Sequence, residues 1–494
     1  MKQTKIFTFF FLISLFSLLP KKAGSQTWSS PVALTTGTLS DRNPAVSVFI
    51  AVTLARPVCL CWETDRNGNW DIYSRFNYTG TEWSSPIAVT TDPDSDINCS
   101  VAYDTCRSLW WCAWQSKRDG NWNIYVSSGD SLSGWSIPTR ISSSSATEQN
   151  PTIAVSTEDS TVWVVWESDS TGYWNIYSRY YNGTTWSSIM PITADTFKNA
   201  HPKIATYTVP SRVFAVWESN RDGNWNIYQS VYSGSWSPPA PFTTADLFND
   251  LSPSLVSDFT NEGGWTLWQC DSSGNYEIYS AGGDTNRITQ HDSADITPAG
   301  ISLGFPVRQF GPPYCIVWAT NRDGNYNIYS LQQMGIGLLS VDQDPSDDRN
   351  PVVSAITVNS NYYLWAIWES NRDGNWNIYG SYQIIPVGGV EETAIVNHQP
   401  LTINYHLYQN HPNPFTLETT IFYTCPTEEK VSIKIYDLLG RLVRTLVNES
   451  QRAGEHNIKW DGKDSEGRTL PSGVYFCSFE TPNYSSINKM LFLK

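Results

Sequence analysis

The pattern Trp-Glu-Ser-Asn-Arg-Asp-Gly-Asn-Trp-Asn-Ile-Tyr, or a close variant of it, recurs along most of this chain. Its first tryptophan returns at steps of 50 to 52 residues, at Trp62, Trp114, Trp166, Trp217, Trp268, Trp318 and Trp368. Repeats of this length, with short strand-like runs between turn signals, are typical of propeller blades. The repeat therefore predicts an all-β, seven-bladed β-propeller over residues 27–383.

Each repeat reads as four strands. The first begins at an acid-x-polar-Pro signal such as Asp41-Arg42-Asn43-Pro44, with proline expected at the strand's first residue because no ladder hydrogen bond is lost there. The second, for example 162–166, is almost entirely apolar, which indicates burial on both faces. A turn in which glycine supplies a positive φ leads to the third strand, and Trp-Ser-x-Pro opens the fourth.

The two ends of the repeat array differ. A fourth-strand segment, 28–35, precedes the first full repeat, whereas no such segment follows the seventh third strand at 377–379. We therefore expect the N-terminal strand to complete the last blade. That pairing would close the ring and remove the exposed strand edges that invite aggregation.

The repeated Ser-x-Arg-Asp-Gly-Asn-x-x-Ile-Tyr hairpins resemble those of TolB-type and sialidase-type β-propellers over residues 27–383. The resemblance implies a propeller fold. It carries little information about activity, because such propellers host binding modules and enzymes alike.

The first 25 residues have the composition of a secretory signal peptide. Lys2 and Lys5 precede an apolar run at 6–19, and Ala23-Gly24-Ser25 offers a cleavage site before Gln26. The run is too short to span a bilayer comfortably, so we expect a cleaved signal and no transmembrane span in the mature chain. An uncleaved anchor is the alternative. The predicted localisation is secreted or on the outer cell surface.

The net charge and the cysteines limit the partners and the chemistry that we expect for this chain. The net charge of −15 argues against a nucleic-acid partner, whose phosphates would be repelled. Four of the nine cysteines lie one to three residues before an anchor tryptophan and are expected to act as small core residues: Cys59, Cys61, Cys112 and Cys315. Two other pairs are possible disulfides in an oxidising compartment, Cys99 with Cys106 and Cys425 with Cys477.

A different domain follows the repeats. A linker is predicted at 384–402, where Pro and Gly precede a polar stretch. Residues 403–494 contain short alternating strands separated by Asp-Gly and Ser-Gly turns, which predicts a small Ig-like β-sandwich.

Several motifs of this second domain occur in a recognisable order. They are Tyr-Gln-Asn-His-Pro-Asn-Pro-Phe at 408–415, Ile-Lys-Ile-Tyr-Asp at 433–437, Gly440-Arg441, Trp-Asp-Gly at 460–462 and Ser-Gly-Val-Tyr at 472–475. In this order they resemble the C-terminal sorting domain of the type IX secretion system and the related Ig-like fold of flagellar hook-capping proteins. The resemblance implies that the type IX machinery is a partner through residues 403–494. A plain Ig-like accessory domain is the alternative.

The strand starts and the turns are expected to crowd one rim of the propeller. The acids placed at the channel mouth are Asp41, Asp96, Glu148, Asp250, Asp295 and Asp348, with Asn199 breaking the series. The turn arginines are Arg66, Arg118, Arg221, Arg322 and Arg372, with Thr171 and Ser273 as exceptions. One interpretation is that acids and arginines pair within or between blades. The other is a polar ring that binds a sugar or a peptide.

The candidate ligand-binding residues combine this rim with positions that break the repeat. They are Asp41, Arg42, Asp96, Glu148, His201, Asp348 and Arg349. Arg42 and Arg349 are the strand-start arginines, in the two blades that meet at closure. The aromatic residues beside each turn suggest carbohydrate stacking, against the alternative of inter-blade packing. These aromatic residues are Trp70, Trp122, Trp174, Trp225, Tyr276, Tyr326 and Trp376.

Metal binding and catalysis have weaker signals. Asp65, Asn67, Asn69 and Asp71 alternate as calcium ligands would, but the glycine does not fall where an EF-hand needs it, so a simple turn is the alternative and no cofactor is expected. A sialidase-like glycoside hydrolase would use the arginines over the channel, yet the chain departs from the sialidase Arg-Ile-Pro and Asp-box patterns. We therefore predict a non-catalytic binding or adhesion module for an extracellular glycan or peptide.

Overall fold

The computed structural model describes most of the chain. The described ranges are 27–47, 57–143, 145–156, 158–208, 211–243, 247–256, 265–281, 285–302, 314–332, 339–342, 344–358, 361–386, 406–407, 410, 413–425, 429–452 and 454–494. All regular secondary structure in these ranges is β. No helix in them has the length and apolarity needed to cross a membrane. The predicted signal peptide and the linker beyond Pro386 lie outside these ranges.

Residues 27–386 form antiparallel sheets of one recurring design, and seven such sheets are present in the described residues. Sheet 1 contains β2 (Asp41–Val46), β3 (Val58–Thr64), β4 (Asp71–Asn77) and β5 (Ile87–Ala88). Sheet 2 contains β6 (Asp96–Asp104), β7 (Leu109–Ser116), β8 (Asn123–Asp130) and β10 (Thr139–Arg140), with β9 (Gly134–Trp135) also beside β8. Sheet 3 contains β11 (Glu148–Val155), β12 (Val162–Ser168), β13 (Asn175–Tyr181) and β14 (Met190–Pro191).

The remaining four sheets repeat the order. Sheet 4 contains β15 (Asn199–Thr208), β16 (Ser211–Ser219), β17 (Asn226–Tyr232) and β18 (Ala240–Pro241). Sheet 5 contains β19 (Asp250–Val256), β20 (Trp265–Cys270), β21 (Glu277–Ala281) and β22 (Thr285–Arg287). Sheet 6 contains β23 (Asp295–Ser302), β24 (Tyr314–Thr320), β25 (Asn327–Gln332) and β26 (Leu339–Ser340). Sheet 7 contains β27 (Asp348–Val358), β28 (Asn361–Ser370), β29 (Asn377–Pro386) and β1 (Val32–Ala33).

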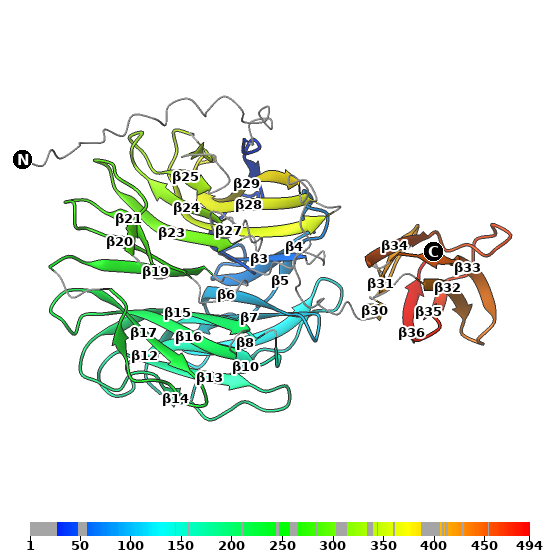
Figure 1. Cartoon of the computed structure of the whole chain (residues 1–494), viewed down its shortest axis with the longest axis horizontal. Helices are drawn as coiled ribbons and strands as arrows, with labels where there is room; N and C mark the ends of the chain where they lie inside the picture. Colours follow the sequence, from blue (N-terminus) through cyan, green and yellow to red (C-terminus); the bar gives the residue numbers. More distant parts are fainter. Residues whose placement is uncertain are drawn as a thin grey trace, which may run out of the picture.

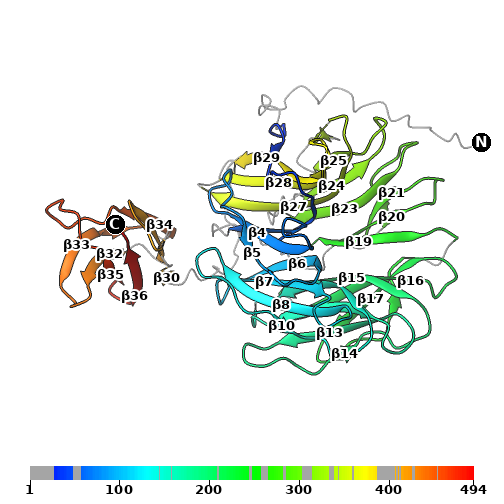
Figure 2. The ribbon, with the colours of Figure 1, turned by 180° about the vertical axis from the view of Figure 1, so that it is seen from behind.

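The N-terminal strand closes a ring of sheets. Val32 pairs with Gly380 and Ala33 with Tyr379, so β1 is the outer strand of sheet 7, as the repeat ends predict. The first strand of each sheet contacts the first strand of the next, and β27 contacts β2. Figure 1 shows the blue strands of sheet 1 beside the yellow strands of sheet 7, and Figure 2 shows the same neighbourhood from behind. The architecture is therefore propeller-like.

The second strands form the buried layer between sheets. All residues of β3 and β12 are buried, in agreement with their apolar sequence. The seven anchor tryptophans are at most 3% exposed. Packing between sheets is exemplified by Phe76 of sheet 1, whose ring lies 4.7 Å from that of Trp110 in sheet 2. Because each sheet buries both faces against its neighbours, a polar alternation is absent from these strands.

Three sequence expectations need correction. The first strands of six sheets contain a proline, and it is not their first residue: Pro44 is the fourth, inside a β-bulge where the register shifts between Arg42 and Ala45. A bulge tolerates proline because the ladder is already interrupted there. The fourth strands are only two or three residues long. The linker does not begin at 384, because β29 continues to Pro386 and buries Ile385.

The cysteines of the described residues are all free. Cys59, Cys61 and Cys112 are buried in the core between sheets 1 and 2, as expected for small apolar residues. Neither of the two possible disulfides, Cys99 with Cys106 or Cys425 with Cys477, is present in this structure.

The C-terminal domain is a two-sheet sandwich. One sheet has the order β30 (His406–Leu407), β31 (Thr419–Cys425), β34 (Gly454–Trp460), and the other β33 (Leu442–Gln451), β32 (Glu429–Asp437), β35 (Gly473–Glu480), β36 (Ser485–Phe492). Phe415, Trp460 and Phe492 are each 1% exposed and form an aromatic cluster at its centre. The alternating strands of the sequence thus bury one face of each sheet, which agrees with the predicted Ig-like domain.

Candidate functional site

One face of the ring, the turn face, carries the starts of the first strands and the turns between second and third strands. Each turn ends in one aromatic residue whose carbonyl oxygen accepts the N–H of the first residue of the next sheet; Trp376 O, for example, accepts Asp41 N–H at 2.7 Å. These seven residues, the aromatic circle, are Trp70, Trp122, Trp174, Trp225, Tyr276, Tyr326 and Trp376. All seven are half-buried, so each residue keeps part of its surface exposed.

Cationic side chains lie against part of this circle. The Arg42 guanidinium is 5.4 Å from the ring centre of Trp376 and 6.0 Å from that of Trp70. Arg349 lies 5.0 Å from Tyr326 and 6.0 Å from the same Trp376. Arginine is the side chain best suited to such stacking, because its guanidinium is planar and weakly hydrated. We call Tyr326, Arg349, Trp376, Arg42 and Trp70 the cationic arc.

The strand-start acids lie beneath this face. Asp41, Asp96 and Asp348 are buried, and each accepts a hydrogen bond from the turn arginine of its own sheet, with Arg118 donating to Asp96 Oδ2 at 2.9 Å. That arginine also stacks on a tyrosine of the third strand in five sheets, at 4.2 to 4.5 Å. The acids and arginines therefore pair within the sheets, which was one of the two interpretations of the sequence.

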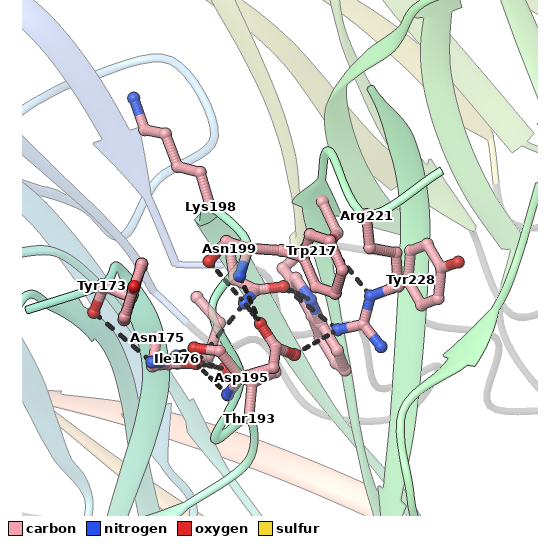
Figure 3. Close-up of polar contacts among 12 residues, drawn as sticks. Tyr173, Asn175, Ile176, Thr193, Asp195, Lys198, Asn199, Trp217, Arg221 and Tyr228 are labelled. Atoms are coloured by element: carbon pink, nitrogen blue, oxygen red, sulfur yellow. Dashed lines mark hydrogen bonds and ion pairs between the residues drawn. The ribbon is translucent and has the colours of Figure 1, made fainter. Parts of the chain in front are cut away.

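Sheet 4 has an asparagine instead of an acid at the start of its first strand, and nearby residues keep the hydrogen bonds. Asn199 stands where other sheets have an acid, and its Oδ1 still accepts Trp217 Nε1–H at 3.1 Å. Asp195 supplies the missing charge: it accepts Arg221 Nη2–H at 2.8 Å and Asn199 Nδ2–H at 2.9 Å (Figure 3). Lys198 extends away from this cluster, and its ammonium lies 5.7 Å from the ring centre of Trp225 in the aromatic circle.

A second circle of polar side chains joins neighbouring sheets and was missed by the sequence analysis. It consists of the residue after each anchor tryptophan: Glu63, Gln115, Glu167, Glu218, Gln269 and Glu369. We call it the carboxyl–amide belt. Each member accepts a backbone N–H from the first strand of the next sheet, as Glu63 Oε1 does from Asn98 at 2.6 Å. The signal was a polar residue inside an otherwise apolar, buried strand.

The donor of each belt contact is a residue in the left-handed conformation. Asn43, Asn98, Asn150, His201 and Asn350 have φ near 50°, which asparagine tolerates better than most residues, and Ser252 and Thr297 share the conformation. In sheet 6 the belt is interrupted, because Ala319 takes the place of the acid or amide and offers no acceptor to Asn350. Among the described residues, Thr297 Oγ1 beside this gap is buried without a hydrogen-bond partner.

Burial changes the acidity of the belt. Burial raises the pKa of Glu63 to about 7, against which the hydrogen bonds from Asn98 and Asn43 act. Burial also raises the pKa of Glu369, whose Oε2 accepts Asn43 N–H. The pKa of Asp348 is raised to about 7 by burial, with the neighbouring Asp342 acting in the same direction. These carboxyls are therefore easier to protonate than surface acids.

His201 and Lys203 add cationic character to sheet 4. His201 Nδ1 lies 2.8 Å from Glu218 Oε2, and this hydrogen bond raises the pKa of His201. The side chain of His201 is 57% exposed. Two residues further on, burial of the amino group lowers the pKa of Lys203, although part of its side chain keeps exposed area.

The residues predicted as a possible calcium site hold loops together. Asn67 Nδ2–H donates to Asp71 Oδ2 at 2.7 Å, and Asn69 Nδ2–H donates to backbone oxygens of Asp92 and Asp94. Asp65 Oδ1 accepts Ser40 N–H at 2.8 Å. Within the ranges that the structure describes, no three His, Cys, Asp or Glu side chains are grouped closely enough to hold a metal ion. Asparagine nitrogens thus face the oxygens that a cation would need.

The structure brings only some of the predicted site residues together. Arg42 and Arg349 meet at Trp376, from opposite sides of the closure between sheets 7 and 1. Glu148 is buried at the start of β11, in a sheet whose turn carries Thr171 in place of arginine. Asp41, Asp96 and Asp348 lie below the surface. His201 donates its backbone N–H to the belt residue Glu167.

Comparisons with known proteins show what the C-terminal domain is similar to. Residues 419–483 match the family model of the FlgD Ig-like domain. The Basal-body rod modification protein FlgD of Salmonella typhimurium is 44% identical over 55 residues, which cover 11% of this chain and 24% of that protein, and the Salmonella typhi protein matches equally. The chain thus spans about a quarter of the length of the curated relatives it matches. The C-terminal domain is Ig-like.

Solved structures similar to the chain include propeller proteins of several kinds. Polysaccharide lyase Uly1 has a TM-score of 0.44 at 10% identity and covers 70% of this chain and 90% of its own. The parainfluenza virus 5 hemagglutinin-neuraminidase ectodomain has a TM-score of 0.42 at 10% identity, covering 73% and 85%. TolB from Acinetobacter baumannii has a TM-score of 0.38 at 13% identity, covering 63% and 82%. Similarities this distant carry no functional argument.

Proposed function

We propose that the seven sheets are the blades of a seven-bladed β-propeller, and that this propeller is an exported, non-catalytic binding or adhesion module. Its ligand is an extracellular carbohydrate or peptide bound on the turn face. The observation that carries the proposal is the aromatic circle: seven half-buried aromatic residues, each anchored by its backbone carbonyl to the neighbouring sheet.

The aromatic circle suits ligand binding because its rings are both held and accessible. The hydrogen bonds of the turn carbonyls fix where each ring lies, so little conformational entropy is lost when a ligand covers it. Aromatic side chains combine a large apolar face with few rotatable bonds, and for this reason they dominate many recognition surfaces. If these residues served only to pack the blades against each other, we would expect them to be fully buried, as the anchor tryptophans are.

The charges of the turn face favour binding over catalysis. A sialidase-like glycoside hydrolase, the alternative, needs a carboxyl group that reaches its substrate. Asp41, Asp96 and Asp348 are buried and hydrogen-bonded to turn arginines of their own sheets. Glu63 and Glu369 are buried and accept backbone N–H groups. These acids are therefore occupied by the scaffold.

The Ig-like domain is proposed to direct export through the type IX secretion system. The match to the FlgD Ig-like domain supports the fold, and the ordered motifs of 403–494 support the sorting role. We further propose that residues 1–25 are a signal peptide. Expression with and without residues 403–494 in a bacterium that has this secretion system tests both points. We expect the full chain outside the cell with Gln26 as its first residue, and the truncated chain retained; equal export of both would refute the sorting role.

The binding proposal is tested by applying the purified protein to glycan and peptide arrays, with and without a calcium chelator. The substitution Trp376→Ala should abolish the array signal, because it removes the aromatic ring that both Arg42 and Arg349 approach. Tyr484→Ala, in the Ig-like domain, is the matched control and should leave binding unchanged. Absence of any bound glycan or peptide, or equal binding by the Trp376 variant, would refute the proposal.

A further inference from the structure

The cationic arc differs from the rest of the aromatic circle in its charge. The side chains at the second position of the first strands are uncharged in the other five sheets: Ile97, Gln149, Ala200, Leu251 and Ile296. Only sheets 1 and 7, which meet at the closure, place an arginine there. The resulting order along the face is Tyr326, Arg349, Trp376, Arg42, Trp70, with each guanidinium within 6.0 Å of two ring centres.

Arg42 is held in place without using its hydrogen-bond donors. The two indole rings of Trp70 and Trp376 flank its guanidinium, and the side chain is exposed. Among the described residues it makes no hydrogen bond or ion pair. Its positive charge acts on the carboxyls of Glu63 and Glu369, but these are buried and accept the backbone N–H groups of Asn98 and Asn43 instead of hydrogen bonds from Arg42. The five N–H donors of Arg42 are therefore oriented and available to an anion.

Arg349 is a second donor, held in an ion pair at the surface. It pairs with Asp347 at 3.0 Å, and both side chains are well exposed, at 45% and 31%. Exposed pairs of this kind contribute little to stability, so an incoming anion can replace Asp347 at small cost. Both arginines lie within 6.0 Å of the ring centre of Trp376, so two cationic groups are gathered at one aromatic residue.

We infer that the cationic arc binds acidic sugar residues of a polysaccharide, with Arg42 and Arg349 contacting the anionic groups and Trp376 stacking on a sugar ring. This inference rests on the proposed function and names its ligand class. A sugar ring presents an apolar face of C–H groups to an aromatic ring and acidic substituents at its edge, which is the combination that the arc offers. A circle of repeated aromatic residues also suits a ligand that is itself a repeating polymer.

The charge of the whole chain limits where such a polymer can bind. With a net charge of −15, the chain as a whole repels a polyanion. At physiological ionic strength this repulsion is screened beyond about 8 Å, so the local charge of the arc decides binding. The acidic polysaccharide should therefore bind at this part of the circle, and its affinity should fall as salt is added.

Affinity electrophoresis of the purified full chain tests the inference. The gels contain polygalacturonate, dextran sulfate or unsubstituted dextran, so that carboxylate, sulfate and neutral sugars are compared. We expect retardation in one or both acidic gels, and the acid that retards identifies the anionic group. Arg42→Gln should weaken that binding about tenfold or more, because a charge-assisted bidentate contact is lost. Arg42→Lys, which keeps the charge but loses the planar fork, should recover only part of it.

The matched control is Arg441→Gln, which removes the same charge from an exposed site on the Ig-like domain and should leave the retardation, measured against a gel without polymer, unchanged. Equal retardation by dextran and by the acidic polymers, no retardation by either acidic polymer, or wild-type binding by Arg42→Gln would overturn the inference. Neutral binding that Trp376→Ala still abolishes would leave the proposed function standing while the acidic ligand is rejected. Unchanged thermal unfolding of each variant verifies that the fold is intact.

Discussion

Glu63 Oε1 in sheet 1 accepts the backbone N–H of Asn98 in sheet 2 at 2.6 Å, and its Oε2 accepts Asn43 Nδ2–H of its own sheet at 3.0 Å. The carboxyl thus ties two sheets together while remaining 5% exposed. Two other sheets use glutamine at the same position, Gln115 and Gln269. A neutral side chain therefore satisfies the same geometry.

The first prediction concerns the pH dependence of stability through Glu63. Burial raises the pKa of Glu63 from 4.5 to about 7 in the folded state. The folded state thus holds a proton that the unfolded state releases between these values, so the free energy of unfolding falls as pH rises across this window, by up to about 3 kcal/mol. Glu63→Gln should remove that loss and be more stable than wild type at pH 8, with little difference at pH 5.

Urea unfolding at the two pH values measures this effect. The reverse substitution Gln115→Glu is the matched control and should lose stability at pH 8 but not at pH 5. If Glu63→Gln were less stable than wild type at pH 8, the ionised carboxyl would be stabilising and the assignment of the pKa shift to burial would be wrong.

A second prediction tests the belt as the contact between blades. Gln115→Ala leaves Asn150 N–H without the acceptor that now lies at 2.9 Å. A buried donor without a partner costs about 1–3 kcal/mol, and the loss should be visible in the midpoint of thermal unfolding. Ile137→Ala is the control: this side chain is 89% exposed, so its removal should change stability by less than about 0.5 kcal/mol. Equal midpoints for Gln115→Ala and the control would show that the belt contributes nothing.

The buried ion pairs beneath the turn face give a third prediction. Asp96 is fully buried and accepts Arg118 Nη2–H at 2.9 Å, while Arg118 is 17% exposed. Arg118→Ala should therefore destabilise the protein by about 2–3 kcal/mol, below the cost of breaking a fully buried pair, because water partly replaces the arginine. Lys459→Ala breaks a pair in which both side chains are more than half exposed, and chemical denaturation should show a change of about 0.5 kcal/mol or less. Similar losses in both variants would contradict the distinction.

His201 provides a fourth prediction. Its hydrogen bond to Glu218 raises the pKa of His201 above 6.5, so the stability that the contact provides is present at low pH and is lost as pH rises through the folded-state value. The other charged groups near it are Glu167, which acts in the same direction, and Lys203, which opposes it. An NMR titration should give a value above 6.5 in the wild type and a lower one in Glu218→Gln. Identical titration curves would refute the role of Glu218.

The scaffold follows from the sequence because it is repeated. The buried second strands, the turns and the pairing of the N-terminal strand with the last sheet were all predicted from the repeat and from its two ends. The position of proline was misjudged, because the bulge after Arg42 depends on the backbone conformation of Asn43, which no pattern of apolar residues reports. The end of β29 was misjudged because Ile385 continues a strand after the tryptophan period has stopped.

The candidate site was predicted less completely. Arg42 and Arg349 were identified as positions that break the repeat, and the structure shows that they share Trp376. The belt was overlooked because the second strand was taken to end at its anchor tryptophan, whereas β12, for example, continues through Glu167 to Ser168. The contacts by which Asp195 replaces the missing strand-start acid of sheet 4 could not be predicted from the sequence. Asp195 lies in a loop four residues before Asn199, and loop residues do not follow the periodic pattern.

The most direct test of the central claim, that the turn face is a ligand-binding surface, is a crystal structure of the protein with an acidic oligosaccharide such as an oligogalacturonate. We expect a sugar ring stacked on Trp376, with a carboxylate hydrogen-bonded to Arg42. An oligosaccharide bound on the outer strands or on the Ig-like domain, with the aromatic circle uncovered, would contradict the account.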